Sequence, residues 1–216
     1  MNNSKSLKNE LIFSYASGTA SFSKSLMAAT YLHLNSAESK TYKMFESFCG
    51  NALLKNEQIK PKNLTAKMCI NNDLASENSS SGSSNSNPIS KIVGPIENIK
   101  WKKIFKGFEE FSFSLATKEK VKLLRIGPGV KVPMHSHSGN EYILVLDGSF
   151  HDEYGTYNKG DLQINDSKIR HTPIGSNNGF CICMSIVEDD LIFFGPFAPI
   201  LNIFTSLKSF FISFFR

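Results

Sequence analysis

Apolar residues in the first third of the chain recur every three or four positions, which is the spacing of one face of an α-helix. They fall into three groups: Leu7, Leu11, Ile12 and Tyr15; then Phe22, Leu26, Met27 and Leu34; then Tyr42, Phe45, Phe48, Leu53 and Leu54. Gly18 and Thr19 interrupt the pattern after the first group. Asn35 and Ser36 separate the second group from the third, and Ser36 is suited to cap the third helix. We therefore expect three helices, and a shorter fourth helix over residues 64–72. The expected core consists of Phe22, Met44, Phe45 and Phe48.

The pattern changes at a tract rich in Ser and Asn. Residues 76–90 read S-E-N-S-S-S-G-S-S-N-S-N-P-I-S and show no apolar periodicity before Ile89, which is typical of a flexible linker. Beyond the tract, apolar runs typical of strands alternate with turns, around residue 104 and at 111–115, 121–126, 142–146 and 181–187. This predicts an α+β chain with a small helical domain over residues 1–75, a flexible linker over 76–93 and an all-β domain over 94–216.

Two polar segments of the β region carry the candidate chemistry. From Gly129 the chain reads G-V-K-V-P-M-H-S-H-S-G-N-E-Y-I-L-V-L-D-G, and from Gly160 it reads G-D-L-Q-I-N-D-S-K-I-R-H. Alternate side chains of a strand share a face, so His135 and His137 are expected to point the same way. With Glu141 and His171 they supply three imidazoles and one carboxylate, a set that suits zinc, iron, manganese, nickel or copper. The alternative is scattered polar residues on a solvated sheet, but three of the five His of the chain occupy these positions.

These segments resemble the two signature motifs of the cupin family, and the spacing is complete in both. The resemblance implies an all-β cupin barrel, also called a double-stranded β-helix. It also implies a divalent metal ion, with zinc favoured, and the implied metal ligands are His135, His137, Glu141 and His171.

The second motif departs from the cupin pattern. Cupins usually carry Pro and Gly where this chain has Asp166 and Lys168, and Asn where it has Gly175. The segment N-D-S-K is itself turn-forming, so we expect an altered path for the loop that leads to His171, with the ligand set unchanged. His151 lies outside the motif and is expected at the surface or behind the ligands.

The helical part resembles a second family, the zinc-binding anti-sigma domain of ChrR-type transcriptional regulators. The similar segments are S-Y-A-S-G-T around Tyr15, then A-A-T-Y-L-H-L-N-S-A-E-S, then C-G-N-A-L-L. In that family a cupin follows the anti-sigma domain in the same order. The resemblance implies that the helices sequester an ECF-type sigma factor and that the metal-binding cupin is a sensory domain which releases it.

The zinc ligands of the ChrR-type anti-sigma domain are missing. That family uses one His before the first helix and the pattern H-x-x-x-C-x-x-C at the end of the second. The corresponding residues here are Ser6, Tyr31, Asn35 and Glu38, which do not replace His or Cys in a tetrahedral site. We therefore predict that the N-terminal domain holds no zinc and is stabilised by apolar packing.

Other reactive residues have simpler interpretations. Cys181 and Cys183 alternate on one expected strand, so their thiols face the same side, in the core or as an oxidant-sensitive pair near the metal. Asp152 and Glu153 lie in an expected hairpin, where we interpret them as solvated. The chain has no G-x-S-x-G, phosphate-binding loop or C-x-x-C, which gives no support to a hydrolase or a nucleotide enzyme.

The C-terminal segment is rich in Phe and amphipathic. One face of an expected helix contains Ile200, Ile203, Phe204, Leu207, Phe211 and Phe214, and the other contains Asn202, Ser206, Ser209 and Ser213. We favour packing on the barrel or on a second copy of the chain in a homodimer. Peripheral attachment to a membrane surface is the next interpretation, and insertion is the third.

Charge and cysteine usage bound the setting. The net charge is +5, and the whole excess lies in residues 1–72, which contain nine Lys and four Glu. Singly scattered Lys residues favour a solvated surface or a protein partner over direct contact with nucleic acid. Four Cys without a disulfide framework, and an N-terminus without the apolar segment of a signal peptide, indicate a reducing, cytoplasmic setting.

The favoured function is thus a ChrR-like anti-sigma factor involved in transcription regulation, for example in a stress response. The alternative is a cupin metalloenzyme, a dioxygenase or an isomerase that acts on a small organic substrate. A third interpretation is a binding module whose helical domain has lost its partner. The same four ligands serve all three functions, since a fold does not determine a function.

Overall fold

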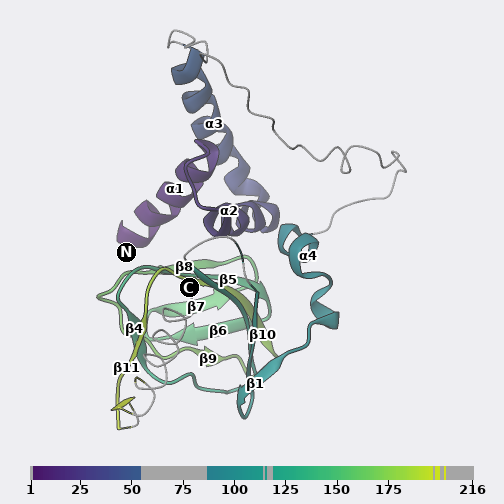
Figure 1. Ribbon diagram of the computed structural model, residues 1–216, viewed down its shortest axis with the longest axis vertical. Coiled ribbons are helices and arrows are strands. Elements are labelled where there is room, and N and C mark those ends of the chain that lie inside the picture. The colour runs from purple at the N-terminus through teal and green to yellow at the C-terminus, as the bar shows by residue number, and fades with distance from the viewer. Residues whose placement is uncertain are drawn as a thin grey trace, which may run out of the picture.

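Three helices lie on one side of a barrel of antiparallel strands (Figure 1). The computed structural model describes residues 2–54, 87–113, 115, 119–196, 198–199 and 202. The expected fourth helix over residues 64–72, most of the expected linker, and most of the amphipathic C-terminal segment lie outside the described residues. None of the described helices is both long and apolar enough to cross a bilayer.

The three expected helices are present. They are α1 (Asn2–Ala16), α2 (Phe22–Leu34) and α3 (Ser39–Leu54). Gly18, whose φ of 73° favours glycine, lies in the turn after α1, and the Ser21 side chain caps α2 by accepting a hydrogen bond from the backbone N–H of Lys24. A short 3₁₀ helix, η1 (Ser36–Glu38), separates α2 from α3 at the expected place.

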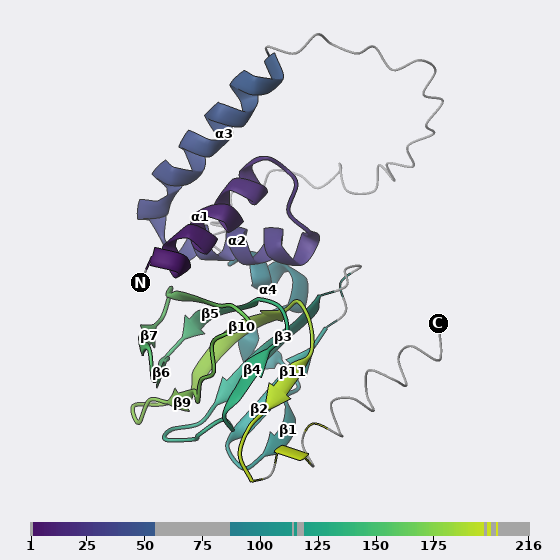
Figure 2. The same ribbon diagram turned by 90° about the vertical axis from the view of Figure 1, so that its left-hand side faces the viewer.

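The expected helical core is mostly wrong. Phe22, Met44 and Phe48 are 54%, 60% and 65% exposed, and only Phe45 packs against the core. The buried apolar residues of the helices are instead Leu11, Ile12, Leu26, Met27, Ala28 and Tyr31. In Figures 1 and 2, α3 runs away from the barrel, whereas α2 lies over it. The apolar spacing predicted the helices, but it did not show which apolar face of the helices packs against the barrel.

The barrel is built from three antiparallel sheets. A six-stranded sheet has the order β1-β2-β3-β10-β5-β8, and smaller sheets have the orders β7-β6-β9 and β11-β4. The strands of the large sheet are β1 (Lys102–Phe105), β2 (Phe108–Ser112), β3 (Lys120–Ile126), β5 (Glu141–Asp147), β8 (Leu162–Asn165) and β10 (Cys181–Val187). The others are β4 (His135–His137), β6 (Ser149–Asp152), β7 (Gly155–Asn158), β9 (Ile174–Gly175) and β11 (Leu191–Phe193). The predicted α+β class with an all-β barrel is confirmed.

Strand β5 explains how the helices attach. Residues 141–146 are buried at every position, although an antiparallel strand with one wet face would alternate. One face of β5 looks into the barrel, and the other lies beneath the helices (Figure 2). A single hydrophobic cluster joins Leu26 and Met27 of α2 to Leu144 of β5 and Ile186 of β10. The helices and the barrel therefore share one core.

Polar contacts reinforce this junction. Lys24 Nζ lies 2.5 Å from Glu188 Oε1, and Ser23 Oγ donates to Glu119 Oε2 at 2.9 Å. Asn35 Nδ2 donates to the carbonyl of Gly160 at 2.8 Å. These contacts fix the orientation of α2 on the sheet, which the apolar contacts alone would leave less specific.

The end of the expected linker is ordered. Residues Pro88–Val93 form helix α4, capped by the Asn87 side chain, which accepts from the backbone N–H of Ile89 at 3.2 Å. Ile89 is fully buried in the core that the helices share with the barrel. A second 3₁₀ helix, η3 (Ile96–Asn98), leads to β1. The linker prediction therefore does not hold for residues 88–93, because one buried isoleucine anchors this segment despite its polar surroundings.

Candidate metal centre

The four residues predicted as metal ligands lie together inside the barrel. His135, His137, Glu141 and His171 are all buried, and their nearest donor atoms all lie within 4.8 Å of one another. His135 and His137 come from β4, and Glu141 is the first residue of β5. His171 faces His135 across an isolated bridge, in which each backbone N–H donates to the other carbonyl at 3.1 Å.

A turn at Asp166 shapes the loop that leads to His171, where cupins usually carry Pro and Gly. Asp166 supplies the turn: its side chain accepts from the N–H of Lys168 at 2.9 Å, and its carbonyl accepts from the N–H of Ile169 at 3.1 Å. This is the turn chemistry that Asp and Asn provide.

The donor atoms converge, and those of His137 are left without a hydrogen-bond partner. The Nε2 atoms of His135 and His171 are 3.1 Å apart, and His171 Nε2 lies 3.3 Å from Glu141 Oε2. His137 Nε2 lies 3.1 Å from the same carboxylate oxygen, yet neither ring nitrogen of His137 has a partner with hydrogen-bond geometry. Buried polar groups are normally paired, so orphaned nitrogens around a shared point fit a cation that accepts their lone pairs.

Neighbouring acceptors orient two of the imidazoles. His135 Nδ1 lies 2.8 Å from the carbonyl of Pro133, and His171 Nδ1 lies 3.0 Å from Asp152 Oδ2. A proton on each Nδ1 donates to these oxygens, so the neutral form of each ring presents the lone pair of Nε2 to the cluster. Histidines that bind metals are commonly held in this way.

Asp152 is the functional residue that the sequence interpretation missed. We expected a solvated carboxylate in a hairpin, but its side chain is 0% exposed. It also accepts hydrogen bonds from Gln163 Nε2 at 2.7 Å and from the N–H of Tyr154 at 2.8 Å. The available signal was strand alternation, because Asp152 lies two residues after the buried Phe150 and so shares its face of β6. Glu153, its exposed neighbour, accepts from the N–H of Thr172 at 2.8 Å.

The electrostatics separate the roles of the ionisable groups. Burial lowers the pKa of His135 to about 4, so its imidazole is neutral at pH 7. Burial alone would lower the pKa of His171 as well, but its hydrogen bonds with Asp152 and Glu141 raise it to about 9. Burial opposes ionisation of Glu141, yet contacts with His137 and His171 hold its pKa below the ordinary value. The anionic Glu141 thus attracts a positive charge into the cluster.

The two strand cysteines lie in the barrel core. Cys181 and Cys183 are buried with their Sγ atoms 3.5 Å apart, next to Ile126, Val145 and Phe150. The hydrogen bond with Cys181, together with burial, raises the pKa of the Cys183 thiol well above its ordinary value. An un-ionised thiol is a poor nucleophile, so the geometry favours packing.

The positions that correspond to zinc ligands in ChrR-type domains form a different cluster. Tyr31 donates from its hydroxyl to Glu38 Oε1 at 3.2 Å, and Asn35 Nδ2 donates to the carbonyl of Tyr31 at 3.0 Å. Lys8 Nζ lies 3.0 Å from Glu38 Oε1. Ser6 is exposed, and His33 and His151 are exposed as well.

Comparison with known proteins agrees with both parts of the fold. A family model for the ChrR cupin-like domain matches residues 90–188. The anti-sigma-E factor ChrR of Cereibacter sphaeroides is 33% identical over 107 residues, which are 49% of this chain and 50% of that protein. The chain therefore spans about half the length of this curated relative.

Solved structures extend the similarity to the helices. A chain of the crystal structure of Rhodobacter sphaeroides SigE in complex with the anti-sigma ChrR superposes with a TM-score of 0.67 and 27% identity, covering 83% of this chain and 96% of that chain. An RmlC-like cupin of Ralstonia eutropha is similar over 44% of this chain and 66% of its own, at 20% identity and a TM-score of 0.40. Residues 90–188 are thus similar to the ChrR cupin-like domain, and the chain as a whole resembles the anti-sigma ChrR in the order of its helical and barrel parts.

Proposed function

We propose that this protein is a ChrR-like anti-sigma factor. Its helices sequester an ECF-type sigma factor, and its cupin barrel is the sensory part. The observation that carries this proposal is the similarity over 83% of the chain, helices included, to a structure in which the anti-sigma factor ChrR is in complex with SigE. A cupin enzyme needs no such helical layer.

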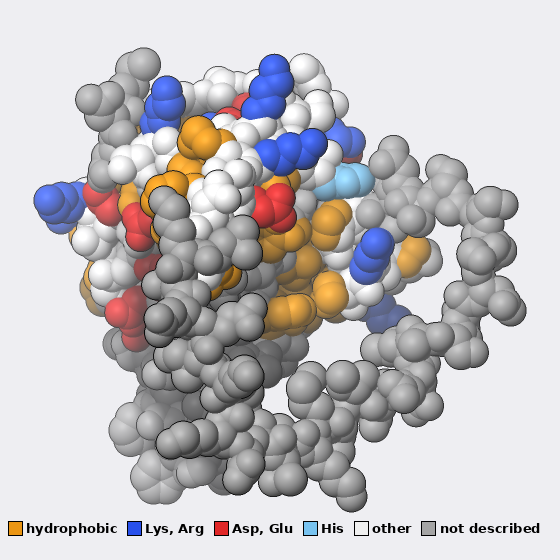
Figure 3. All heavy atoms as spheres, turned by 90° about the horizontal axis from the view of Figure 1, so that it is seen from above, with side chains coloured by type: hydrophobic (Ala, Val, Ile, Leu, Met, Phe, Trp, Pro, Cys, Tyr) orange, Lys and Arg blue, Asp and Glu red, His pale blue; other side chains and the backbone are white. Residues whose placement is uncertain are grey.

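An exposed apolar surface on the helices supports a protein partner. Phe13, Met44, Phe45 and Phe48 line a cleft of about 260 Å³ on α1 and α3, which we call the phenylalanine cleft. Its rings are ordered, since Phe13 and Phe45 meet edge to face at 5.4 Å. Figure 3, a view from the helical end, shows hydrophobic side chains exposed among basic ones. Apolar grooves of this kind accept the apolar face of a partner helix.

The charge of the N-terminal part favours an acidic partner segment. The net positive charge of the chain lies wholly in residues 1–72. Lysines around an apolar groove attract carboxylates and speed association without determining the bound conformation. We propose that the sigma factor presents an apolar helix with acidic flanks to the phenylalanine cleft, in the cytoplasm where transcription takes place.

The cupin is proposed to hold one divalent metal ion through His135, His137, Glu141 and His171. Three imidazoles and a carboxylate fit zinc best, and iron, manganese or nickel fit the same donors. The ion would supply positive charge that fixes the converging donors. Glu141 neutralises part of that charge, and Asp152 holds the ring of His171 in place. With four protein donors the site suits a structural or sensory role better than substrate turnover.

The helical domain is proposed to fold without metal. Glu38, Tyr31 and Asn35 stand at the positions of zinc ligands, and they bond with one another and with Lys8. Hydrogen bonds and one ion pair thus tie α1, α2 and η1 together where ChrR-type domains use zinc.

Co-expression of the full chain with the ECF-type sigma factor encoded beside it tests the proposal. A pull-down should recover both proteins, and a reporter driven by that sigma factor should be repressed. The full chain is required because the helices share their core with the barrel. If sigma is not retained and the purified protein consumes a small organic substrate with oxygen, the chain is a cupin dioxygenase instead.

A further inference from the structure

A chain of hydrogen bonds leads from the candidate metal centre to the surface on which the helices sit. His171 Nδ1 lies 3.0 Å from Asp152 Oδ2, and Gln163 Nε2 donates to the same oxygen at 2.7 Å. The second proton of that amide donates to the hydroxyl of Tyr157 at 2.9 Å. These residues lie on β6, β8 and β7.

Gln163 connects the two ends of this chain of hydrogen bonds. It is buried, with 4% of its surface exposed, and its Oε1 atom has no hydrogen-bond partner. A buried amide with an unpaired oxygen is unfavourable for stability compared with an apolar side chain of similar size. The residue therefore contributes through its two donors, which orient Asp152 on one side and Tyr157 on the other.

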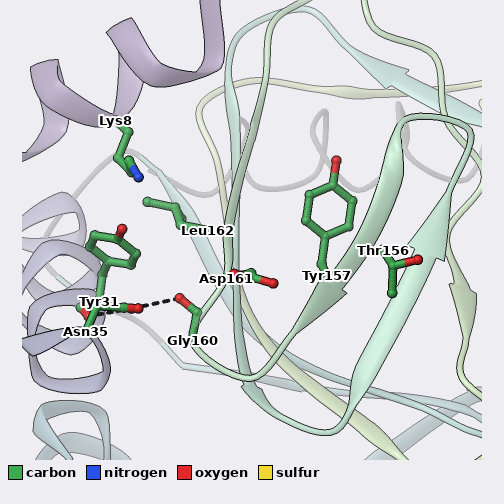
Figure 4. Close-up of a pocket in the computed structure, with 8 residues that line it drawn as sticks. All are labelled: Lys8, Tyr31, Asn35, Thr156, Tyr157, Gly160, Asp161 and Leu162. Atoms are coloured by element: carbon green, nitrogen blue, oxygen red, sulfur yellow. Dashed lines mark hydrogen bonds between the residues drawn. The ribbon is translucent and has the colours of Figure 1, made fainter. Parts of the chain in front are cut away.

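The far end of this chain of hydrogen bonds, at Tyr157, lies at the junction between the barrel and the helices. Tyr157 lines a cleft of about 280 Å³ together with Lys8, Tyr31 and Asn35 of the helical layer (Figure 4). The turn between β7 and β8 closes the same cleft, and the carbonyl of Gly160 in this turn accepts the 2.8 Å hydrogen bond from Asn35.

Local hydrogen bonds hold this turn in place. Its Gly160 has a φ of 91°, and the N–H of Gly160 donates to the carbonyl of Val145 at 2.9 Å. The carboxylate of Asp161 accepts from the N–H of Asn158 at 2.8 Å. Tyr157 and Gln163 lie on the two strands that this turn joins. We therefore expect a shift of either side chain to move the Gly160 carbonyl, which accepts the hydrogen bond from Asn35.

The other end of Asn35 belongs to the cluster that replaces zinc. Its Nδ2 also donates to the carbonyl of Tyr31, whose hydroxyl donates to Glu38. Asn35 therefore contacts both the helical cluster and the barrel through the two N–H groups of its amide. A His or Cys side chain bound to zinc does not have two N–H donors and could not make both contacts.

We propose that Gln163 and Tyr157 are positioning residues that couple occupation of the metal centre to the seating of the helices on the barrel, through the β7–β8 turn and Asn35. The proposal rests on the proposed function, whose sensory step it specifies. When His171 is held through Nε2, its Nδ1–H stays on Asp152, and the Gln163 amide stays ordered. When His171 Nε2 is no longer held, the hydrogen bonds that run from His171 to Tyr157 become less ordered, and the helices detach from the barrel more easily.

Hydrogen exchange with zinc as the probe tests the coupling. In the full wild-type chain, saturating zinc should slow exchange of the amides of α2 and of residues 158–161 by at least about fivefold, a typical coupling factor. Gln163→Met and Tyr157→Phe should still bind one zinc per chain but lose this slowing. Thr156→Val, which lines the same cleft outside the hydrogen-bonded chain, should respond as the wild type does.

Reciprocity supplies a second readout. If zinc tightens the helical seat, the seat must tighten zinc by the same factor. Asn35→Ala should therefore weaken zinc affinity about fivefold, although Asn35 contacts none of the four proposed ligands. Tyr157→Phe keeps the ring that stacks on Phe150 at 4.9 Å, so it serves as the variant that folds if Gln163→Met does not.

The coupling is refuted if zinc slows exchange in Gln163→Met and Tyr157→Phe as much as in the wild type, or if the wild type shows no slowing. Its failure is distinguishable from that of the proposed function. Sigma binding with no zinc effect on the helices overturns the coupling alone. A zinc effect that the two variants abolish, in a chain that does not bind sigma, supports the coupling and overturns the anti-sigma role.

Discussion

The two regions of the molecule differ in how they treat positions that bind metal in related proteins. In the barrel, His135, His137, Glu141 and His171 converge, and His137 is left without hydrogen-bond partners. In the helices, three of the four residues at the zinc positions, Tyr31, Asn35 and Glu38, bond with one another. Both clusters are polar and tie together distant segments of the chain. What distinguishes them is whether the donors and acceptors are already satisfied.

This difference is a practical criterion for metal sites. A buried set of donor atoms that face one point fits a cation, whereas a set in which N–H and O–H groups meet carboxylate and carbonyl oxygens needs none. Lys8 supplies to Glu38 the positive charge that a metal would otherwise bring. We therefore expect the helical domain to keep the cross-link without an ion.

The largest expected effect is loss of metal from the barrel. His171→Ala removes an imidazole that faces both His135 and Glu141, so metal content should fall from about one ion per chain to nearly none. Elemental analysis of the purified protein measures this. His151→Ala, which removes an exposed imidazole outside the cluster, should keep full metal content. Unchanged metal in His171→Ala would place the ion elsewhere.

Removal of the metal should separate the two regions. A strong chelator should lower the free energy of unfolding by about 2.7 kcal/mol, relative to protein with free metal at 100 times its Kd. The helical circular dichroism at room temperature should not change, because hydrogen bonds and the shared core hold the helices. A helical signal that collapses with chelator and returns with zinc would reveal a ligand set in the helical domain.

Loss of the hydrogen bond that orients His171 should weaken metal binding less than loss of the His171 imidazole itself. Asp152→Asn replaces the carboxylate that accepts from His171 Nδ1, and it should weaken metal affinity about 10- to 100-fold while one ion still binds at saturation. Competition with a chromogenic chelator gives the affinity. Asp147→Asn, at an exposed carboxylate on the same barrel, is the matched control and should have no effect. Equal affinities in both variants would mean that Asp152 does not orient the ligand.

The smallest effect concerns the ion pair of the helices. Burial opposes ionisation of Glu38, but Lys8 lowers the pKa of this carboxyl below its ordinary value of 4.5. A lowered pKa in the fold means that the stabilisation is present above pH 4.5 and is lost as the pH falls through the folded pKa. The pair is partly exposed, so Glu38→Gln should cost about 0.2–1 kcal/mol at neutral pH. Urea unfolding of both proteins at several pH values measures this, and a difference that grew as the pH fell would contradict it.

The sequence predicted the elements better than their partners. Apolar spacing predicts α1, α2 and α3, and motif spacing predicts that the four donors of the barrel lie together. Apolar spacing did not show that α2 packs on β5, because it identifies the apolar face of a helix but not the element that this face contacts. Phe22 and Phe48 were therefore assigned to a core from which they point away.

The polar environment of the site was also beyond sequence reasoning. The sequence predicts a solvated carboxylate at Asp152 and no role for Gln163, because each acquires its partners only when the strands pair. In the fold, Asp152 lies beside His171, and Gln163 lies beside Asp152 and Tyr157. Motifs record the residues that touch a ligand, whereas the residues that orient them follow from topology.

The most direct test of the account is a binding titration between the purified full chain and the neighbouring ECF-type sigma factor. We predict a one-to-one complex that Phe48→Glu, in the phenylalanine cleft, weakens at least about tenfold, as expected for a central apolar anchor. Ile104→Glu, at an apolar residue of the barrel that is 44% exposed, should bind as the wild type does. Absence of binding by the wild type, or equal affinities for the two variants, would contradict the claim that the helical layer sequesters sigma.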